Sequence, residues 1–256
     1  MSWPLKLLSA TRLVPAGRWV LTRLRRGESY PPVGRVRFGS LRRLSPLSRQ
    51  FGYDRGQPVD RYYIERFLAD HSSDIRGRVL EIADRSYTRM FGGNRVTRSD
   101  VLHARDHDEE VTIVGDLSVG DTIPAAAFDC VIVTQTLQVI YDVPAAIATL
   151  HRILKPGGVV LATVPGISPI SRYDMDRWGY YWSFTTASAE RLFAAAFSPQ
   201  NVMVRAHGNV LASTAFLYGL ASQELRRTEL DHHDPDYQLL IAIRAEKPLV
   251  TAAEPS

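Results

Sequence analysis

Cysteine is nearly absent from this chain of 256 residues, and long uninterrupted runs of apolar side chains are absent as well. The single cysteine, Cys130, excludes a disulfide framework within the chain, so a reducing compartment is expected. No apolar run approaches the roughly 20 residues that a membrane-spanning helix needs. Near the N-terminus, Lys6, Arg12 and Pro15 interrupt any signal-peptide core. We therefore expect a cytoplasmic protein.

Acidic side chains are scarce at the start of the chain. Residues 1–50 hold eleven Lys or Arg and one acid, Glu28, whereas the remaining residues hold 20 bases and 26 acids. The net charge of the first segment is therefore +10, and the net charge of the rest is −6. A nucleic-acid-binding protein should carry its basic footprint on the binding domain. This distribution therefore argues against a nucleic-acid partner.

The basic segment over residues 1–50 is predicted to form an N-terminal arm and a linker. Residues 4–26 place Leu, Val and Trp among arginines at helical spacing, and Pro15 and Gly17 divide them into two short helices. This pattern favours an amphipathic arm, in which residues 1–26 contact an anionic membrane surface or a protein partner. An arm folded over the body, or a partly disordered extension, explains the same residues.

The rest of the chain alternates strand patterns with helix patterns. We expect a folded domain over residues 51–248, followed by a tail over residues 249–256. The predicted strands are residues 78–83, 95–101, 111–117, 128–136, 159–165, 201–208 and 237–245. Helical segments between strands indicate parallel strands with right-handed crossovers. The predicted fold class is α/β, with a doubly wound, mostly parallel, seven-stranded sheet and helices on both faces.

Acidic and polar side chains follow four of these strands near their ends. They are Glu81 and Asp84 at the first strand, Asp100 at the second, Asp116 at the third, and Gln135 and Thr136 at the fourth. In open α/β sheets, ligands bind beyond the carboxyl ends of the strands. An acid that ends the second strand can accept both ribose hydroxyls of a nucleoside, and an acid after the third strand can accept an adenine amine. The pattern predicts a nucleotide-type cofactor site.

Several short motifs together resemble the class I S-adenosylmethionine-dependent methyltransferases. They are E-x-A-D at the first strand, D-V at the second, G-D-L at the third, F-D-x-V at the fourth and L-K-P-G-G before the fifth. The resemblance extends over about residues 55–245 and is strongest to the small-molecule group with L-K-P-G-G, including enzymes of glycan and natural-product pathways. It implies a Rossmann-like fold, S-adenosylmethionine as cofactor, and O-methylation of a small-molecule or sugar hydroxyl.

The resemblance also implies roles for individual residues around the cofactor. These are Glu81, Ala83 and Asp84 at the turn beside the methionine moiety, Gln135 and Thr136 beneath the sulfonium, Asp100 at the ribose, Val101 against the adenine, and Asp116 and Leu117 at the adenine edge.

The first turn lacks the alternating glycines that this family places there. Ala83, Arg85 and Tyr87 stand at these positions. Glycine lets the backbone approach a ligand closely and adopt a positive φ. Ala83 adds a single methyl group, whereas Arg85 and Tyr87 add bulk unless they point away. Two other functions therefore stay open: a reaction without methyl transfer in the same pocket, such as a cyclisation, and a non-catalytic binding module.

The segment after the fifth strand interleaves aromatic with charged side chains, which suits a small-molecule or saccharide substrate. A lid packed on the sheet would explain the same residues. Either Arg55 or Arg61 could pair with a ligand carboxylate, unless both belong to a surface network of ion pairs. The predicted substrate-binding residues are Arg55, Tyr173, Arg177, Trp178, Tyr181 and Trp182.

Methyl transfer to a hydroxyl needs a base near the acceptor oxygen. The candidates are His207, at the end of the sixth strand, and Asp174, although a histidine in such a place is more often structural. The HHDPD stretch over residues 232–236 lacks further ligands, so no metal is expected. No D/N-P-P-Y motif follows the fourth strand, which disfavours methylation of bases or glutamine amides.

Overall fold

The computed structural model describes residue 31 and residues 34–105 and 109–249. The chain divides into two units, over residues 1–44 and 45–256. In its described part, the first unit contains the 3-10 turn Gly39–Leu41 and exposes the side chains of Val36 and Phe38. The contact predicted for residues 1–26 lies outside the described residues, and it stays a prediction.

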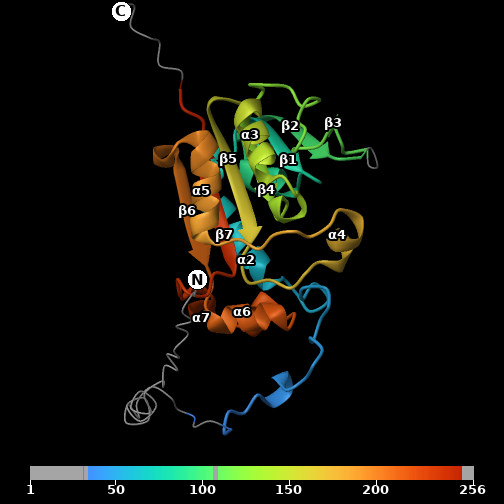
Figure 1. Ribbon diagram of the computed structural model, residues 1–256, viewed down its shortest axis with the longest axis vertical. Helices are drawn as coiled ribbons and strands as arrows, with labels where there is room; N and C mark the ends of the chain where they lie inside the picture. Colours follow the sequence, from blue (N-terminus) through green and yellow to red (C-terminus); the bar gives the residue numbers. More distant parts are fainter. Residues whose placement is uncertain (1–30, 32–33, 106–108, 250–256) are drawn as a thin grey trace, which may run out of the picture. The chain divides into compact units, whose positions relative to one another are not determined.

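The second unit is built around one seven-stranded sheet (Figure 1). The strands are β1 Gly77–Ile82, β2 Val96–His103, β3 Ile113–Val114, β4 Phe128–Thr134, β5 Leu154–Pro165, β6 Val202–His207 and β7 Leu240–Glu246. Their order in the sheet is β3-β2-β1-β4-β5-β7-β6, and β7 runs antiparallel to both of its neighbours. The predicted mostly parallel seven-stranded sheet is confirmed.

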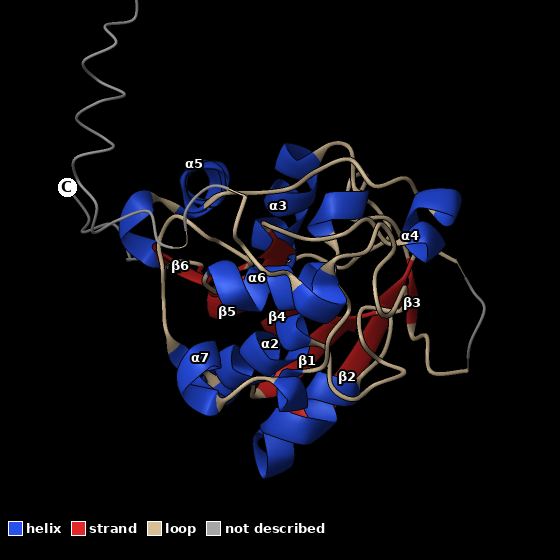
Figure 2. Ribbon diagram, turned by 90° about the horizontal axis from the view of Figure 1, so that it is seen from below, coloured by secondary structure: helices blue, strands red, loops and turns tan. Residues whose placement is uncertain are grey.

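Helices cover both faces of this sheet (Figure 2). They are α2 Val59–Asp70, α3 Val143–Ile153, α4 Arg172–Arg177, α5 Thr186–Phe197, α6 Val210–Leu217 and α7 Arg227–Asp231. Buried residues of α3 and α5 belong to one core cluster, and buried residues of α2, α6 and α7 belong to the other. None of the helices in the described part of the chain has the length and apolar character needed to cross a bilayer.

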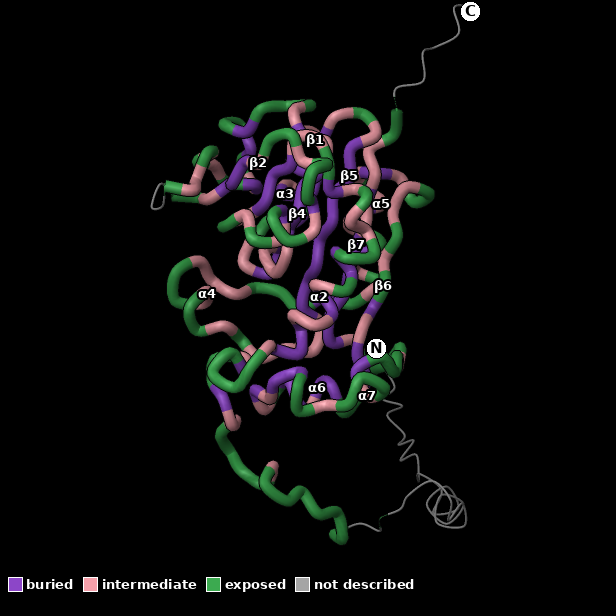
Figure 3. Tube along the Cα trace, turned by 180° about the vertical axis from the view of Figure 1, so that it is seen from behind, coloured by how far each residue is buried: buried purple, intermediate pink, exposed green. Residues whose placement is uncertain are grey.

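The alternation of side chains along β4 divides its residues between these two cores. Val131 and Val133 pack with α3 and α5, whereas Cys130 and Ile132 pack with α2 and α6. All four are fully buried, and Figure 3 shows burial concentrated along the central strands. A strand covered on both faces needs such a continuous apolar run. Burial of each large aliphatic side chain contributes about 1.5–3 kcal/mol.

The second strand is longer than its sequence pattern predicts. It continues through Leu102 to His103, and both residues pair with β3. Asp100 therefore lies inside the strand, opposite Leu80 of β1. The prediction that Asp100 ends this strand is wrong, because apolar residues after Asp100 carry the strand onward.

The connection from β1 to β2 contains little helix. A π-helical turn, Thr88–Gly92, leads into a 3-10 turn, Gly93–Arg95, before β2 begins. A regular crossover helix is therefore replaced here by a compact turn. This turn is the first loop at the carboxyl edge of the sheet, where the sequence predicts the cofactor site.

Candidate functional site

Two cavities adjoin one another at the carboxyl ends of the central strands. One, of about 390 Å³, lies at the ends of β2 and β3 and is called the β2 cavity. The other, of about 680 Å³, lies against the start of α2 and is called the α2 cavity. The residues that line both are Ile82, Ala83, Gln135, Thr136 and Asp174. A ligand that reaches across this shared boundary would occupy both cavities.

Backbone strain marks this boundary. Ala83, directly after β1, has φ +74°, and Gln135, directly after β4, has φ +49°. The left-handed region costs an L-residue about 1 kcal/mol or more. Both residues are held by backbone bonds to a neighbouring strand, from Ala83 N to Leu102 O at 3.0 Å and from Gln135 N to Thr163 O at 2.9 Å. Ala83 thus occupies a backbone conformation that favours glycine, as the resemblance implies.

Glu81 holds the first turn together. Its carboxylate accepts the backbone N–H groups of Tyr87 at 3.0 Å and Thr88 at 2.7 Å. The side chain is buried, and burial raises the pKa of Glu81 to about 7 although these hydrogen bonds oppose the rise. Glu81 therefore fixes the shape of a turn without alternating glycines, and it also lines the α2 cavity.

The bulky side chains of the first turn leave room for a ligand. Arg85 points away from both cavities, and its guanidinium donates to the backbone oxygen of Glu110 at 2.8 Å. Tyr87 forms part of the wall of the α2 cavity, where its hydroxyl accepts from Arg61 at 3.3 Å and its ring stacks on Phe91. Asp84 lines the same cavity. The substitutions for glycine therefore reshape the turn without filling the site.

Asp100 lies outside both cavities. Its buried carboxylate accepts from Arg78 Nε at 2.6 Å and from an Arg98 guanidinium nitrogen at 3.1 Å. Burial disfavours the charged form, yet the hydrogen bonds and charges of the two arginines outweigh burial and lower the pKa of Asp100. Val101 is fully buried within the sheet. The residues assigned to the ribose and the adenine face are therefore structural, and His103 and Ala104 line the β2 cavity in their place.

Asp116 and Leu117 lie where the sequence places them, after β3 and in the wall of the β2 cavity. One oxygen of Asp116 accepts from the backbone N–H and the hydroxyl of Ser118, both at 2.7 Å. This turn fixes the carboxylate at the rim of the cavity. The contact of both residues with adenine stays a prediction.

The segment after β5 contributes three of its predicted residues to the cavities. Asp174 lines both cavities, while Trp178 and Tyr181 line the β2 cavity. The ring of Trp178 lies edge-on to His103, with ring centroids 5.9 Å apart, and below the Arg105 guanidinium at 4.6 Å. Figure 1 shows α4, which carries Asp174, beyond the ends of the central strands. This segment therefore covers the β2 cavity.

Three other predicted substrate residues point elsewhere. Tyr173 is 63% exposed, and the Arg177 guanidinium lies 3.6 Å from the centroid of its ring. Trp182 donates its indole N–H to the backbone oxygen of Ile140 at 3.1 Å. None of these three side chains lines either cavity. Tyr173 and Trp182 are exposed, and α4 buries no residue, so these side chains do not pack on the sheet.

Arg61, and not Arg55, lines the α2 cavity. Arg55 forms an ion pair with Glu224, with nitrogen–oxygen distances of 3.0 and 2.5 Å, and lines neither cavity. Arg61 lines the α2 cavity, and its Nε donates to the hydroxyl of Tyr53 at 2.8 Å. Of the two arginines that the sequence offers, the structure brings Arg61 to the site.

His207 is not part of the site. It lines a separate cavity of about 110 Å³ that shares no residue with the other two. Its ring stacks on Tyr63 at 5.6 Å, and burial lowers the pKa of His207 to about 4. The prediction that it acts as a base fails because β6 lies at the edge of the sheet, beyond β7 and β5 from the strands that carry the site.

The polar residues of the α2 cavity that sequence reasoning did not assign to the site include Asp60, Gln138 and Tyr180. Asp60 and Gln138 are 8% and 3% exposed. Asp60 has the sequence signature of a helix start, which hides any second role. Gln138 and Tyr180 lie in irregular segments whose side-chain directions follow from tertiary packing alone.

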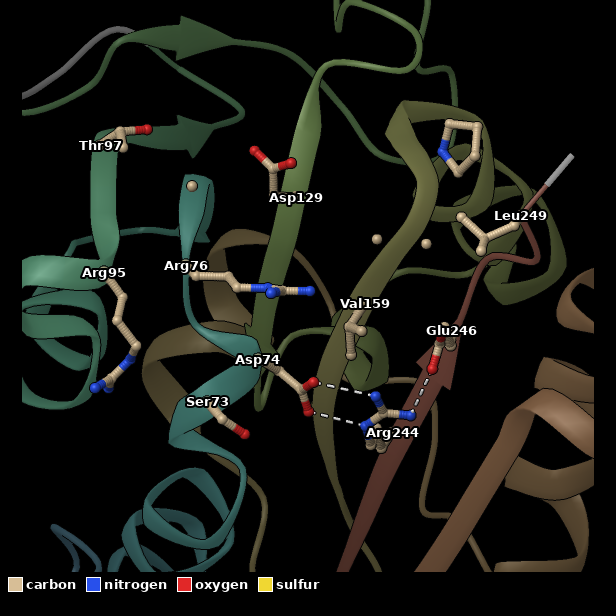
Figure 4. Close-up of a pocket in the computed structure, with 14 residues that line it drawn as sticks. Ser73, Asp74, Arg76, Arg95, Thr97, Asp129, Val159, Arg244, Glu246 and Leu249 are labelled. Carbon is tan, nitrogen blue, oxygen red and sulfur yellow. Dashed lines mark hydrogen bonds and ion pairs between the residues drawn. The ribbon is translucent and has the colours of Figure 1, made fainter.

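A further cavity of about 730 Å³ lies at the opposite, amino edge of the parallel strands. Figure 4 shows Arg244 between Asp74 and Glu246, with nitrogen–oxygen distances of 2.8 and 3.1 Å to Asp74 and 3.1 Å to Glu246. Asp129 in the same cavity pairs with Lys155 at 2.7 Å. These ion pairs neutralise the carboxylates of Asp74, Asp129 and Glu246.

Comparison with known proteins points to one family. A family model described as a methyltransferase domain matches residues 43–201. No curated protein sequence matches the chain significantly. Similar solved structures include an S-adenosylmethionine-dependent methyltransferase from Archaeoglobus fulgidus, with 11% identity, a TM-score of 0.49, and coverage of 73% of this chain and 94% of that one.

Two further solved structures differ in the reaction for which they are named. The N-methyltransferase NodS from Bradyrhizobium japonicum, in complex with S-adenosylhomocysteine, has 14% identity and a TM-score of 0.49, with coverage of 79% of this chain and 95% of that one. The [4+2]-cyclase SpnF has 17% identity and a TM-score of 0.46, with coverage of 72% and 82%. At such low identities, the reaction has to be argued from the chain's own residues.

Proposed function

The chain belongs to the methyltransferase-domain family, with S-adenosylmethionine as its cofactor, and on this premise we propose that it methylates a hydroxyl of a polar small molecule or saccharide. The observation that carries this proposal is the pair of adjoining cavities. They share the strained residues Ala83 and Gln135 and the carboxylate of Asp174. Such a boundary suits a reaction between two ligands, one from each cavity.

The β2 cavity fits the adenosine part of the cofactor. Leu102 and Leu117 provide apolar walls, and Asp116 provides an acceptor for an exocyclic amine. The volume of about 390 Å³ lies within the usual range for small-ligand sites. Ala83 and Gln135 would hold the sulfonium end at the boundary with the α2 cavity.

The residues around the boundary would orient the acceptor and take its proton. The cofactor supplies an electrophilic methyl group, so the rate depends mainly on placing the acceptor oxygen in line with that group. Asp174 lines both cavities and is our candidate for the base. The hydroxyl of Tyr180 stays protonated beside it, because burial and the charges of Asp174 and Asp60 raise the pKa of Tyr180.

A reaction without methyl transfer is the second candidate. The alanine side chain of Ala83, where the family has glycine, and His103 at the end of β2 favour it, since both residue types depart from the family pattern around the cofactor. Arg85, however, leaves the cavities open. The mass of the product separates the two candidates, because only methyl transfer adds one methyl group to the acceptor.

The proposal is tested first by binding and then by turnover. Mass spectrometry of the purified protein should find S-adenosylmethionine or S-adenosylhomocysteine, and calorimetry should measure the affinity for both. Turnover is then followed as release of S-adenosylhomocysteine with a panel of polyols and saccharides. Failure to bind either ligand would overturn the proposal, and turnover without a methyl gain would favour the second candidate.

Replacement of the proposed base gives the matched test. Asp174→Asn should lower kcat by about 10²–10⁴-fold, the usual contribution of a general base, with little change in cofactor affinity. His207→Phe keeps an aromatic ring on Tyr63 and should leave kcat unchanged. Equal losses in both variants would contradict the assignment of the base to Asp174.

A further inference from the structure

One stretch of the described chain exposes apolar side chains in the middle of positive charge. It is residues 34–44, called the arginine segment, in which Leu41 is half-buried and every other residue is exposed (Figure 3). Phe38 is 53% exposed, Val36 is 49% exposed, and Leu44 is exposed completely. Large apolar side chains that gather on a surface mark a site of interaction, whereas single ones do not. The arginine segment is therefore a candidate for a binding surface.

The positive charge of the arginine segment is not neutralised by acids. Its four arginines are Arg35, Arg37, Arg42 and Arg43, and residues 31–50 contain no Asp or Glu. Within the part of the chain that the structure describes, none of the four forms an ion pair, whereas Arg55 of the second unit pairs with Glu224. Four uncompensated charges in so short a stretch attract an anionic partner.

A turn brings apolar and positive side chains of this segment together. Leu41 N donates to the Phe38 backbone oxygen at 3.0 Å, and Arg42 N donates to the Gly39 backbone oxygen at 3.2 Å. The turn sets the Arg42 guanidinium 5.8 Å from the centroid of the Phe38 ring. The segment thus presents a ring and a cation side by side, and both are exposed to a partner.

The surface of an anionic lipid bilayer fits both features. Its head groups supply negative charge, and apolar side chains can enter the boundary between head groups and acyl chains. Arginine suits this boundary as well, because its aliphatic stem can lie along apolar surface while the guanidinium stays at the phosphates. The phosphates of a nucleic acid would pair with the arginines but would leave Val36 and Leu44 in water.

We propose that the arginine segment binds the chain to an anionic membrane surface. Phe38 and Leu44 enter the head-group layer, and the four arginines pair with the lipid phosphates. Each arginine at such a surface strengthens binding about fivefold. The inference is separate from the contact predicted for residues 1–26, because it rests on side chains that the structure describes, and it does not depend on the proposed function.

The test measures co-sedimentation of the full chain with lipid vesicles, made of phosphatidylcholine alone or of phosphatidylcholine and phosphatidylglycerol in equal amounts. The wild type should bind the anionic vesicles and not the neutral ones, and added salt should release it. Arg35→Gln/Arg37→Gln should weaken binding about 25-fold, from two arginines at about fivefold each. The matched control is Arg172→Gln/Arg226→Gln, which removes the same charge from exposed positions of the second unit and should weaken binding less than about threefold.

A second variant tests the apolar contact. Phe38→Ala should weaken binding to the anionic vesicles about tenfold, because a phenylalanine ring that enters the head-group layer leaves water. Its control is Tyr173→Ala, which removes an aromatic ring that is 63% exposed on the second unit and should leave binding unchanged. All of the substituted side chains are exposed, so every variant should melt close to the temperature of the wild type.

The proposal is overturned if the wild type binds neither kind of vesicle, or binds both equally. It is overturned as well if either Arg35→Gln/Arg37→Gln or Phe38→Ala binds like the wild type, since other parts of the chain would then make the contact. An equal loss in Arg172→Gln/Arg226→Gln would contradict it too, because net charge alone would explain binding. A nucleic-acid duplex that displaces the vesicles and loses affinity in the same variants would assign the segment to nucleic acid instead.

Discussion

The two edges of the sheet treat their charged side chains in opposite ways. At the amino edge, Arg244 joins Asp74 and Glu246, and Lys155 joins Asp129 (Figure 4). At the carboxyl edge, the Asp60 carboxylate keeps an oxygen without a partner in the described part of the chain. These amino-edge carboxylates are all in ion pairs, whereas this carboxyl-edge oxygen is not.

This difference distinguishes ion pairs that stabilise the fold from a buried carboxylate oxygen that has no such partner. Strained backbone and unpaired buried oxygens cost stability, so those found at the cavities are candidates for a functional role. Pairing at the amino edge satisfies ions that burial would otherwise penalise. Substitution of a residue in a buried ion pair should therefore change stability alone, whereas substitution of a residue that lines one of the two cavities should change ligand affinity.

The largest expected effect concerns Asp100, whose buried carboxylate pairs with two arginines. Asp100→Asn removes the buried partner of Arg78 and Arg98, which should lower the free energy of unfolding by about 4 kcal/mol. The affinity for S-adenosylhomocysteine should stay within about twofold, because Asp100 lines neither cavity. Urea unfolding and calorimetry measure the two quantities.

Asp116→Ala should give the opposite result. Asp116 is exposed at the rim of the β2 cavity, so its loss should weaken S-adenosylhomocysteine by about tenfold while stability changes little. If Asp100→Asn lost cofactor affinity and Asp116→Ala did not, the division between the two edges would be wrong.

These two acids also show how far sequence reasoning reaches. The position of Asp116 near the end of the third strand is predicted because Gly115 and polar residues follow the apolar pair, although β3 covers only Ile113–Val114 and not the predicted residues 111–117. The position of Asp100 is not, because a strand can continue past an acid when arginines on neighbouring positions neutralise it, and Arg78 comes from another strand. The order of elements follows from periodicity, whereas such cross-strand pairing depends on register.

The remaining errors have the same physical origin. His207 has the residue type of a base, but the antiparallel β7 places its strand at the edge of the sheet. Asp60 has the sequence position of a helix start, and only the tertiary fold brings it to the same cavity as Gln138 and Tyr180. The local position of a residue can be predicted from its sequence, but the partners that its side chain finds across the fold cannot.

A smaller effect on stability is expected at Glu81, at the carboxyl edge of the sheet. Burial raises its pKa from 4.5 to about 7, so the folded state binds a proton more tightly than the unfolded chain does. This contribution to stability is complete below pH 4.5 and is lost as the pH rises through about 7. The loss amounts to about 3 kcal/mol, from the size of the shift.

Glu81→Gln should remove this pH dependence, because the amide keeps an acceptor for the turn and does not ionise. The stability of the variant relative to the wild type should therefore rise between pH 4.5 and about pH 8, as measured by urea unfolding across that range. Asp84→Asn, which removes an exposed acid from the same turn, is the control. Equal behaviour of the two variants would mean that burial of Glu81 does not govern its ionisation.

The smallest expected effect tests the backbone strain at the cavity boundary. Ala83→Gly relieves a left-handed alanine and should raise the free energy of unfolding by about 1 kcal/mol. Ala126→Gly is matched to it, since Ala126 has φ +46° but lies in an exposed turn before β4, outside both cavities. Both variants should gain similar stability, whereas only Ala83→Gly should alter the affinity for S-adenosylhomocysteine in calorimetry. An unchanged affinity in Ala83→Gly would show that the strained backbone at Ala83 shapes the first turn and does not affect cofactor binding.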